Sequence, residues 1–248
     1  METRGRGSGA VELSVVVPVY NEQDSVQPLL EEIEAALAAI EHEVLFVDDG
    51  SSDATAERLV ALKAAFPRLR VLRHARNHGQ SAAIASGVEA ARGTWIATLD
   101  GDGQNDPADI PRLRALAQEG GGERPLLVVG WRRQRQDGWL RRLSSRVANG
   151  VRSRLLGDGT PDTGCGLKLF RRDLFLALPR FDHMHRFLPA LVLREGGEVR
   201  SVPVNHRPRR RGRSKYGVHD RLWVGIADLF GVMWLMRRRM RPETEEVE

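Results

Sequence analysis

Two aspartates one residue apart, Asp100 and Asp102, have a type and spacing that suggest metal or phosphate chemistry. They follow an apolar run, residues 94–99, that is typical of a buried strand, and side chains i and i+2 of a strand share a face. Clustered carboxylates are unfavourable unless a positive charge lies between them. Mg²⁺ commonly bridges one or two carboxylates to the phosphates of a substrate. The alternative is an ordinary acidic turn, because Asp, Gly and Asn are common loop residues.

Length and composition set the limits for any function. The 248 residues can form one large domain, and 41% hydrophobic and 29% charged residues are ordinary for a globular protein. The net charge of +5 and the isoelectric point near 10.1 indicate an anionic partner: phosphate, an acidic membrane surface or nucleic acid. The single cysteine, Cys165, excludes an intrachain disulfide and fits a reducing compartment. Residues 1–10 are polar without the apolar core of a signal peptide, and we expect disorder there.

Apolar β-branched runs alternate with helical patterns from Val11 onward. We expect strands at 13–17, 44–47, 70–73, 95–99 and 126–130, with helices at 26–40, 55–66, 81–92 and after Pro107. Beyond Gly130 the pattern is weaker and predicts a helix at 140–156, a strand at 163–170, a short helix after 181–189 and a last strand at 199–204. Strand–helix alternation predicts an α/β fold with a mostly parallel sheet and helices on both faces.

Polar motifs follow three of the expected strands, at residues 18–22, 48–53 and 100–106. The carboxyl ends of parallel strands lie at one edge of the sheet, and ligands of such folds bind there. The sequence therefore predicts a nucleotide-type pocket in which the three motifs converge.

The C-terminal region has a different character. Residues 207–215 form a concentrated basic loop, and residues 222–236 are apolar except for Asp228. Helical spacing places Leu222, Trp223, Ile226, Leu229, Phe230, Met233 and Trp234 on one face. The run is shorter than the ~20 residues of a membrane span. It fits an interfacial helix on an anionic leaflet, or equally a C-terminal helix packed on the domain or in a dimer.

The motifs together resemble glycosyltransferase family 2, specifically its dolichol-phosphate mannosyltransferase-like group. The matching stretches are VPVYNE (17–22), VDDGSSD (47–53), RNHGQ (76–80), LDGDGQ (99–104) and GRSK (212–215), in the family's order. The resemblance implies a GT-A fold with a catalytic domain at 12–206. Residues 1–11 would then be a disordered N-terminus, and 207–248 a basic loop, an amphipathic helix and a polar tail.

The resemblance also implies roles for particular residues. Asp100 and Asp102 would hold Mg²⁺ or Mn²⁺ under the diphosphate, and Gly101 would let the backbone approach closely. Gln104 matches a position near the donor or acceptor phosphate; its alternative is a turn side chain. The whole nucleotide-binding set is Pro18, Tyr20, Glu22, Val47, Asp49, Asp100, Gly101, Asp102, Arg132, Arg209 and Lys215.

The family inverts the anomeric centre in one displacement. We expect the cation, Arg132, Arg209 and Lys215 to stabilise the departing nucleoside diphosphate, with Asp102, Gln104, Asp162 and Arg132 as the catalytic set. A phosphate acceptor is already ionised at pH 7, because its second pKa is near ~6. A hydroxyl acceptor needs a base, for which Asp162 is the candidate; Asp162 could equally orient Lys168 or an arginine. His183 and His185 are either acceptor-side groups or packing residues.

The expected function is transfer of a sugar from a UDP- or GDP-sugar to a polyprenyl (dolichyl or undecaprenyl) phosphate at the cytoplasmic membrane face. Many relatives in this group carry C-terminal membrane spans, whereas here only the short helix is expected, so a peripheral protein, a homo-oligomer or a separate membrane partner all fit. Two alternatives are transfer to a hydroxyl of a glycan or small lipid, and a non-catalytic module that binds nucleotide-sugar or anionic membrane. We expect no nucleic-acid partner, because interleaved aromatics and a known module are lacking.

Overall fold

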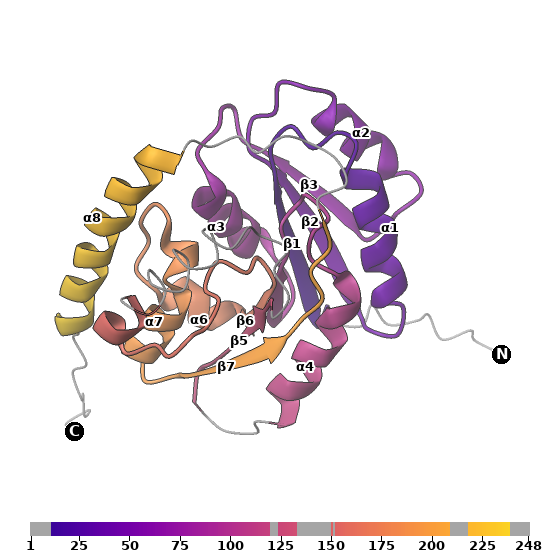
Figure 1. Ribbon diagram of the computed structural model, residues 1–248. Helices are drawn as coiled ribbons and strands as arrows, with labels where there is room; N and C mark the ends of the chain where they lie inside the picture. Colours follow the sequence, from indigo (N-terminus) through magenta and orange to yellow (C-terminus); the bar gives the residue numbers. More distant parts are fainter. Residues whose placement is uncertain (1–10, 120–123, 133–149, 151, 209–217, 239–248) are drawn as a thin grey trace, which may run out of the picture.

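The computed structural model describes residues 11–119, 124–132, 150, 152–208 and 218–238, with the backbone alone for 218–224. The described residues form a seven-stranded sheet covered by helices on both faces (Figure 1).

The sheet is mostly parallel, as predicted. Its strands are β1 (Leu13–Val19), β2 (His42–Asp48), β3 (Leu69–Arg73), β4 (Trp95–Thr98), β5 (Leu126–Trp131), β6 (Lys168–Arg171) and β7 (Glu198–Pro203). They lie in the order β3-β2-β1-β4-β6-β5-β7. Strand β6 runs antiparallel to both of its neighbours, and the other neighbouring pairs are parallel. The reversed β6 was not predicted.

Two hydrophobic cores lie on opposite faces of the sheet. One is covered by α1 (Val26–Ala36), α2 (Thr55–Leu62), the 3₁₀ turn η1 (Pro107–Asp109) and α4 (Ile110–Glu119). The other is covered by α3 (Gln80–Ala90), α6 (Arg172–Ala177), the turn η2 (Met184–Arg186), α7 (Leu188–Arg194) and α8 (Val218–Arg237) (Figure 1). Along β1, Val15 and Val17 enter the first core and Val16 the second, because successive strand side chains point to opposite faces.

Several predicted elements have different bounds. The helices expected at 26–40 and 55–66 end at Ala36 and Leu62. Leu37 is nevertheless buried, and Phe66 packs on the same core, because a turn can present an apolar side chain as well as a helix does. The strand expected at 163–170 occupies Lys168–Arg171, and helix α6 directly after it was missed. Most of the helix expected at 140–156 lies outside the described residues, and residues 152–156 of it are helical.

Helix α8 packs against α7, and the domain covers only part of its predicted apolar face. Ile226, Phe230 and Trp234 are 37%, 65% and 60% exposed, whereas Val232 is 1% exposed. The side chains that pack on the second core are Leu229, Val232, Met233 and Met236. Part of the apolar face therefore packs on the domain, and the adjoining part, Ile226–Phe230–Trp234 at spacing i, i+4, i+8, is an exposed stripe. No helix among the described residues has the length and apolar content needed to cross a bilayer.

Candidate active site

The predicted motifs do converge at one edge of the sheet. Strands β1, β2, β4 and β5 all end there, since their register pairs Val19 with Asp48 and Val16 with Thr98. Because β6 is antiparallel, it begins at this edge, and Lys168 pairs with Thr98. The edge therefore combines the ends of parallel strands with the start of one reversed strand, which we call the donor edge.

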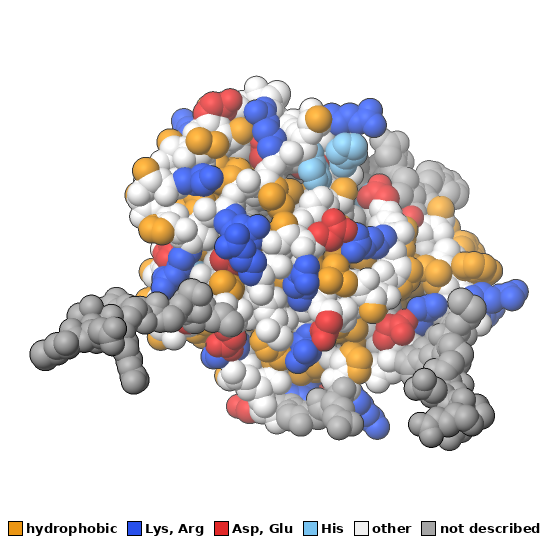
Figure 2. Space-filling view, turned by 180° about the vertical axis from the view of Figure 1, so that it is seen from behind, with side chains coloured by type: hydrophobic (Ala, Val, Ile, Leu, Met, Phe, Trp, Pro, Cys, Tyr) orange, Lys and Arg blue, Asp and Glu red, His pale blue; other side chains and the backbone are white. Residues whose placement is uncertain are grey.

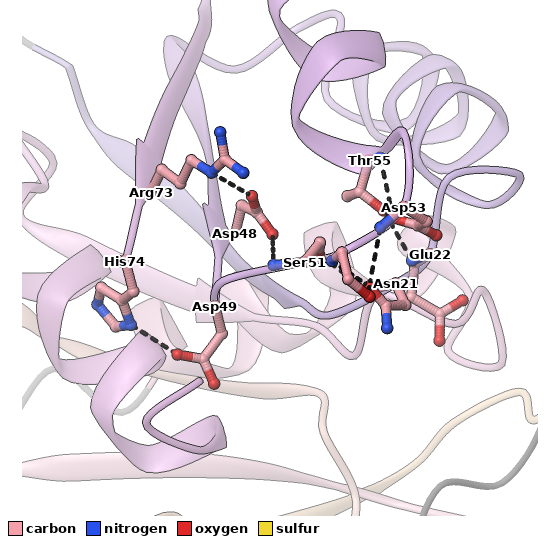
Figure 3. A network of polar contacts seen from close by, with 10 residues as sticks. Asn21, Glu22, Asp48, Asp49, Ser51, Asp53, Thr55, Arg73 and His74 are labelled. Atoms are coloured by element: carbon pink, nitrogen blue, oxygen red, sulfur yellow. Dashed lines mark hydrogen bonds and ion pairs between the residues drawn. The ribbon is translucent and has the colours of Figure 1, made fainter. Parts of the chain in front are cut away.

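Asp48 and Asp49, at the end of β2, have separate partners (Figure 3). Asp48 accepts a hydrogen bond from the backbone N–H of Ser51 at 3.0 Å and lies 3.3 Å from Arg73. Asp49 instead faces the loop after β3 and accepts from the ring of His74 at 2.6 Å. Asp48 thus stabilises its own turn, while Asp49 ties that turn to the neighbouring loop.

The loop after β1 is joined to the same turn. Asn21 has a φ of 53°, and its side-chain oxygen accepts from the backbone N–H of Ser52 at 2.7 Å. The backbone N–H of Asn21 donates to the hydroxyl of Ser51 at 2.8 Å (Figure 3). The N–H of Glu22 donates to the Thr55 hydroxyl at 2.9 Å. These bonds join residues about thirty apart in sequence, so the motifs after β1 and β2 form one rigid wall.

Four nucleotide-binding candidates lie in or beside this wall. Tyr20 and Pro18 are partly buried at the end of β1. Glu22 is 8% exposed, and its carboxylate accepts from the hydroxyl of Ser25 at 3.1 Å. Val47 is fully buried and packs in the second core, so its side chain does not face a ligand.

Two glycines leave the space that Asp100 and its strand end occupy, and the amide of Gln80 bonds to its carboxylate. A Cβ on Gly166 would lie 2.3 Å from the Asp100 carboxylate, and one on Gly101 would lie 2.9 Å from the Pro18 carbonyl. Both positions therefore require glycine for the close approach of neighbouring strand ends. The side-chain amide of Gln80, at the start of α3, donates to Asp100 Oδ1 at 2.8 Å. Burial, with the negative charge of Asp102, raises the pKa of Asp100, while the charges of Lys168 and Arg132 oppose that shift.

Asp102, unlike Asp100, is one of the residues that line a small pocket. It is partly buried, and residues of α1 and Arg207 line the pocket with it. The backbone N–H of Gln104 donates to Asp102 Oδ1 at 3.1 Å, and the Gln104 amide donates to the Arg207 carbonyl at 3.4 Å. Gln104 therefore connects the acidic motif to Arg207, the first residue of the basic loop.

Arg132 and Asp162 form a bidentate ion pair at the end of β5. Arg132 Nε and Nη2 donate to the two carboxylate oxygens at 2.7 and 2.8 Å, and the side chains are 11% and 5% exposed. Burial by itself lowers the pKa of Arg132, but the hydrogen bonds and charge of Asp162 raise it above its ordinary value. Of the two readings of Asp162, the contacts favour orientation of an arginine. Among the described residues no acceptor is bonded to Arg132 Nη1.

Lys168 and Cys165 lie beside this pair. The Lys168 ammonium donates to the Cys165 carbonyl, is 3% exposed, and has a pKa lowered by burial. Burial raises the pKa of the Cys165 thiol. The cysteine sulfur lies 3.7 Å from the Asn105 amide nitrogen and belongs to the first core.

The protein side chains at the donor edge fit a hard divalent cation only if a bound substrate supplies further oxygen ligands. No cluster of three His, Cys, Asp or Glu side chains suited to a metal occurs within the described ranges. Asp102 lines the small pocket and accepts from the Gln104 N–H, and Asp100 accepts from the Gln80 amide. Mg²⁺ and similar ions are usually bound by one or two carboxylates plus substrate phosphates and water. The residues present, Asp100 and Asp102, therefore fit a cation shared with a diphosphate.

The remaining predicted residues separate into two groups. Arg209 and Lys215 lie outside the described residues. His183 contacts Asp228 of α8 at 3.0 Å, and His185 contacts Ser81 at 2.7 Å, so both are engaged in packing the second face.

Residues to which the sequence analysis assigned no role in the site also belong to the donor edge. Gln80 closes the RNHGQ stretch, but its bond to Asp100 depends on how α3 packs on β1. Gly166 and Lys168 reach Asp100 only because β6 is inserted between β4 and β5. His74 carried no sequence signal that we recognise.

The fold and this edge define a class of protein, the GT-A-like nucleotide-sugar transferase fold. The structure is similar to mannosyl-3-phosphoglycerate synthase from Rubrobacter xylanophilus, with a TM-score of 0.68 and 20% identity over 94% of this chain and 77% of that one. It is also similar to glucosyl-3-phosphoglycerate synthase from Mycobacterium tuberculosis, solved with Mn²⁺, UDP-glucose and glycerol 3-phosphate. There the TM-score is 0.67, with 19% identity over 95% and 86% of the two chains.

The chain belongs to glycosyltransferase family 2: the family model "Glycosyl transferase family 2" matches residues 14–178. It is 41% identical over 242 residues to dodecaprenyl-phosphate galacturonate synthase of Rhizobium johnstonii, covering 94% of this chain and 70% of that protein. It is 40% identical over 210 residues to undecaprenyl-phosphate 4-deoxy-4-formamido-L-arabinose transferase of Edwardsiella ictaluri, covering 83% of this chain and 63% of that protein.

Proposed function

We propose that the protein transfers a sugar from a nucleotide-sugar, a UDP- or GDP-sugar, to a polyprenyl phosphate, with inversion and with a divalent cation. The observation that carries the acceptor is the resemblance to two relatives, each named for a polyprenyl phosphate, at 41% and 40% identity. The donor rests on the convergence of the β1, β2 and β4 motifs at the donor edge.

The Arg132–Asp162 pair supports a phosphate acceptor over a hydroxyl. A hydroxyl needs a base, and both oxygens of the Asp162 carboxylate are bonded to an arginine that stays charged. A phosphate monoester needs no such base near neutral pH, because its second pKa is about 6. The site then has to position the two reactants and balance negative charge.

The residues of the donor edge divide that task. Asp49 and the wall formed by the first two motifs would hold the nucleoside, and Asp102 would hold Mg²⁺ or Mn²⁺ with the diphosphate. The cation supplies charge stabilisation of the leaving group. Arg132, fixed by Asp162, would offer Nη1 to a phosphate oxygen. Arg209 and Lys215 are proposed to add charge from the basic loop.

The experiment that tests this function compares two acceptors that differ only in their head group, a phosphate or a hydroxyl. Purified full chain is incubated with Mg²⁺ or Mn²⁺, a panel of UDP- and GDP-sugars, and either undecaprenyl phosphate or undecaprenol in detergent. We expect glycolipid product, detected by mass spectrometry, from the phosphate alone. Product from undecaprenol but not from its phosphate would support the hydroxyl alternative, and no product from either would remove the acceptor assignment.

We also propose peripheral contact with a membrane through α8. The exposed stripe Ile226–Phe230–Trp234 is followed by exposed Arg237 and Arg238. A helix that exposes both apolar and basic side chains is attracted to anionic leaflets. Hydrophobic side chains gather at the edge of Figure 2 on the side of the molecule where α8 lies. The cytoplasmic face of the membrane is the proposed side.

Vesicle flotation tests this contact. The wild type should float with phosphatidylglycerol vesicles more than with phosphatidylcholine vesicles, and Phe230→Ser with Trp234→Ser should abolish most of the binding. Val60→Ser is the matched control, because Val60 is 60% exposed on α2, away from the stripe. Unchanged flotation of the double variant, or dimerisation that the double variant abolishes, would assign the stripe to protein contact instead.

A further inference from the structure

His74, directly after β3, uses both nitrogens of its ring within the donor edge. Nδ1 lies 2.6 Å from Asp49 Oδ1, and Nε2 lies 2.9 Å from the hydroxyl of Ser86 in α3. Figure 3 shows the imidazole pointing from its strand toward the Asp49 carboxylate. Because an ionised carboxylate only accepts, Nδ1 carries the hydrogen; in the neutral ring Nε2 then accepts from Ser86.

The same three residue types form the nucleophilic triad of many hydrolases, but the surroundings do not fit that chemistry. Ser86 lies inside α3, where backbone N–H groups are engaged in helical bonds and cannot form an oxyanion hole. It is Asp49, and not the serine, that lies at the donor edge. The chain Ser86–His74–Asp49 therefore ends on the carboxylate, which it orients.

Asp49 is almost fully enclosed, with one acceptor position left. An ionised carboxylate has about four lone-pair positions. Three are used: His74 Nδ1 and the His78 N–H bond to Oδ1, and the Gly79 N–H bonds to Oδ2 at 2.8 Å. Asp49 is 3% exposed, and within the described part of the chain no further donor bonds to Oδ2.

Two further contacts fix His74 itself. Its backbone N–H donates to the Asp48 carbonyl at 2.8 Å, and its ring meets that of His78 edge-on with centroids 5.4 Å apart. Its side chain is 17% exposed. A ring held in this way has little freedom to rotate, so the hydrogen bond to Asp49 has a defined direction.

We propose that His74 is a positioning residue for donor recognition: it holds Asp49 so that the fourth acceptor position meets a ring N–H of the nucleotide base. This inference rests on the proposed nucleotide-sugar donor. Uracil and guanine carry such an N–H on the edge that they present for pairing, whereas cytosine and adenine present an unprotonated ring nitrogen there. A fixed carboxylate therefore selects UDP or GDP over CDP and ADP, and His74 contributes to that selection.

Calorimetric titration of the full chain with UDP, GDP, CDP and ADP, each with Mg²⁺, tests the inference. The wild type should bind UDP or GDP in preference to CDP and ADP. His74→Leu should weaken the preferred nucleotide about tenfold, the equivalent of one charge-assisted hydrogen bond, and reduce its preference over CDP. His74→Asn should stay within about threefold of the wild type, because the asparagine amide nitrogen can occupy the place of Nδ1.

His183→Leu is the matched control, since it removes a histidine that contacts an aspartate, Asp228 at 3.0 Å, on the second face of the sheet. We expect it to change affinity less than about twofold. In turnover assays, the loss in His74→Leu should appear in the donor KM and not in kcat, which a general loss of folding would not produce.

The possible outcomes separate the inference from the function it rests on. The role of His74 would be overturned if the wild type binds nucleotide and His74→Leu differs from it by less than twofold in both affinity and selectivity. Equal losses in His74→Leu and His74→Asn, with equally lowered melting temperatures, would also overturn it, because they indicate a structural role. Nucleotide binding that depends on His74, without transfer to undecaprenyl phosphate, supports the inference and overturns the acceptor alone. A wild type that binds no nucleotide would overturn both.

Discussion

Replacing Asp162 by asparagine separates its two readings, general base and partner of Arg132. Both side chains of the pair are nearly buried, at 11% and 5% exposure, and are joined by hydrogen bonds of 2.7 and 2.8 Å. Removing one partner of a buried pair leaves an uncompensated charge and costs about 3–5 kcal/mol. Asparagine keeps the volume and one acceptor oxygen, so we expect the free energy of unfolding to fall by about 2–3 kcal/mol.

The measurements are thermal unfolding and nucleotide affinity. For a chain of this size, about 2–4 °C per kcal/mol gives a melting temperature lower by roughly 4–12 °C. Affinity for the nucleoside diphosphate with Mg²⁺ should fall about tenfold, because Arg132 loses its fixed orientation.

Asp173→Asn is the control. Its pair with Arg171 is exposed, at 67% and 48%, and its loss should change stability by less than about 0.5 kcal/mol. Unchanged stability and unchanged nucleotide affinity in Asp162→Asn, with turnover abolished on a hydroxyl acceptor, would refute the orienting role and identify a base.

Three further predictions concern the donor edge and the helix-covered face beside it. Gly166→Ala should lower stability by about 1–3 kcal/mol in chemical denaturation, because its Cβ would lie 2.3 Å from the Asp100 carboxylate; an unchanged midpoint would contradict this packing. Chelation should abolish transfer and added Mn²⁺ restore it, while Asp102→Asn should raise the metal concentration needed for half-maximal activity; an unchanged requirement would exclude Asp102 as a ligand. Burial, with the charges of Lys168 and Arg186, lowers the pKa of His185 well below 6.5, so the unfolded chain binds its proton first. Stability should therefore be full above pH 6.5 and be lost below it by up to about 1.4 kcal/mol per pH unit, a slope that His185→Gln should flatten in urea titrations at pH 5.5 and 7.5.

The sequence predicted the fold and the place of the site for reasons that are local. Strand–helix alternation requires right-handed crossovers and parallel strands, so the motifs after β1, β2 and β4 had to meet at one edge. The sequence predicted Gly101 beside the diphosphate; the structure shows a second reason for this glycine, because a Cβ there would lie 2.9 Å from the Pro18 carbonyl. The exposed stripe of α8 was not predicted, because helical spacing shows which residues are apolar but not which side the domain covers.

The sequence itself, through the periodicity of strands and helices, thus determined that Asp100 and Asp102 follow a strand and that the other motifs lie at the same edge. Only the tertiary structure decided which partner each charge meets. The reversed strand β6 brings Gly166 and Lys168 to Asp100, and Arg132 finds Asp162 thirty residues away. His74 reaches Asp49 across two neighbouring strands. These contacts depend on strand order and direction, which are set by the packing of the whole sheet and leave no periodic signal in the chain.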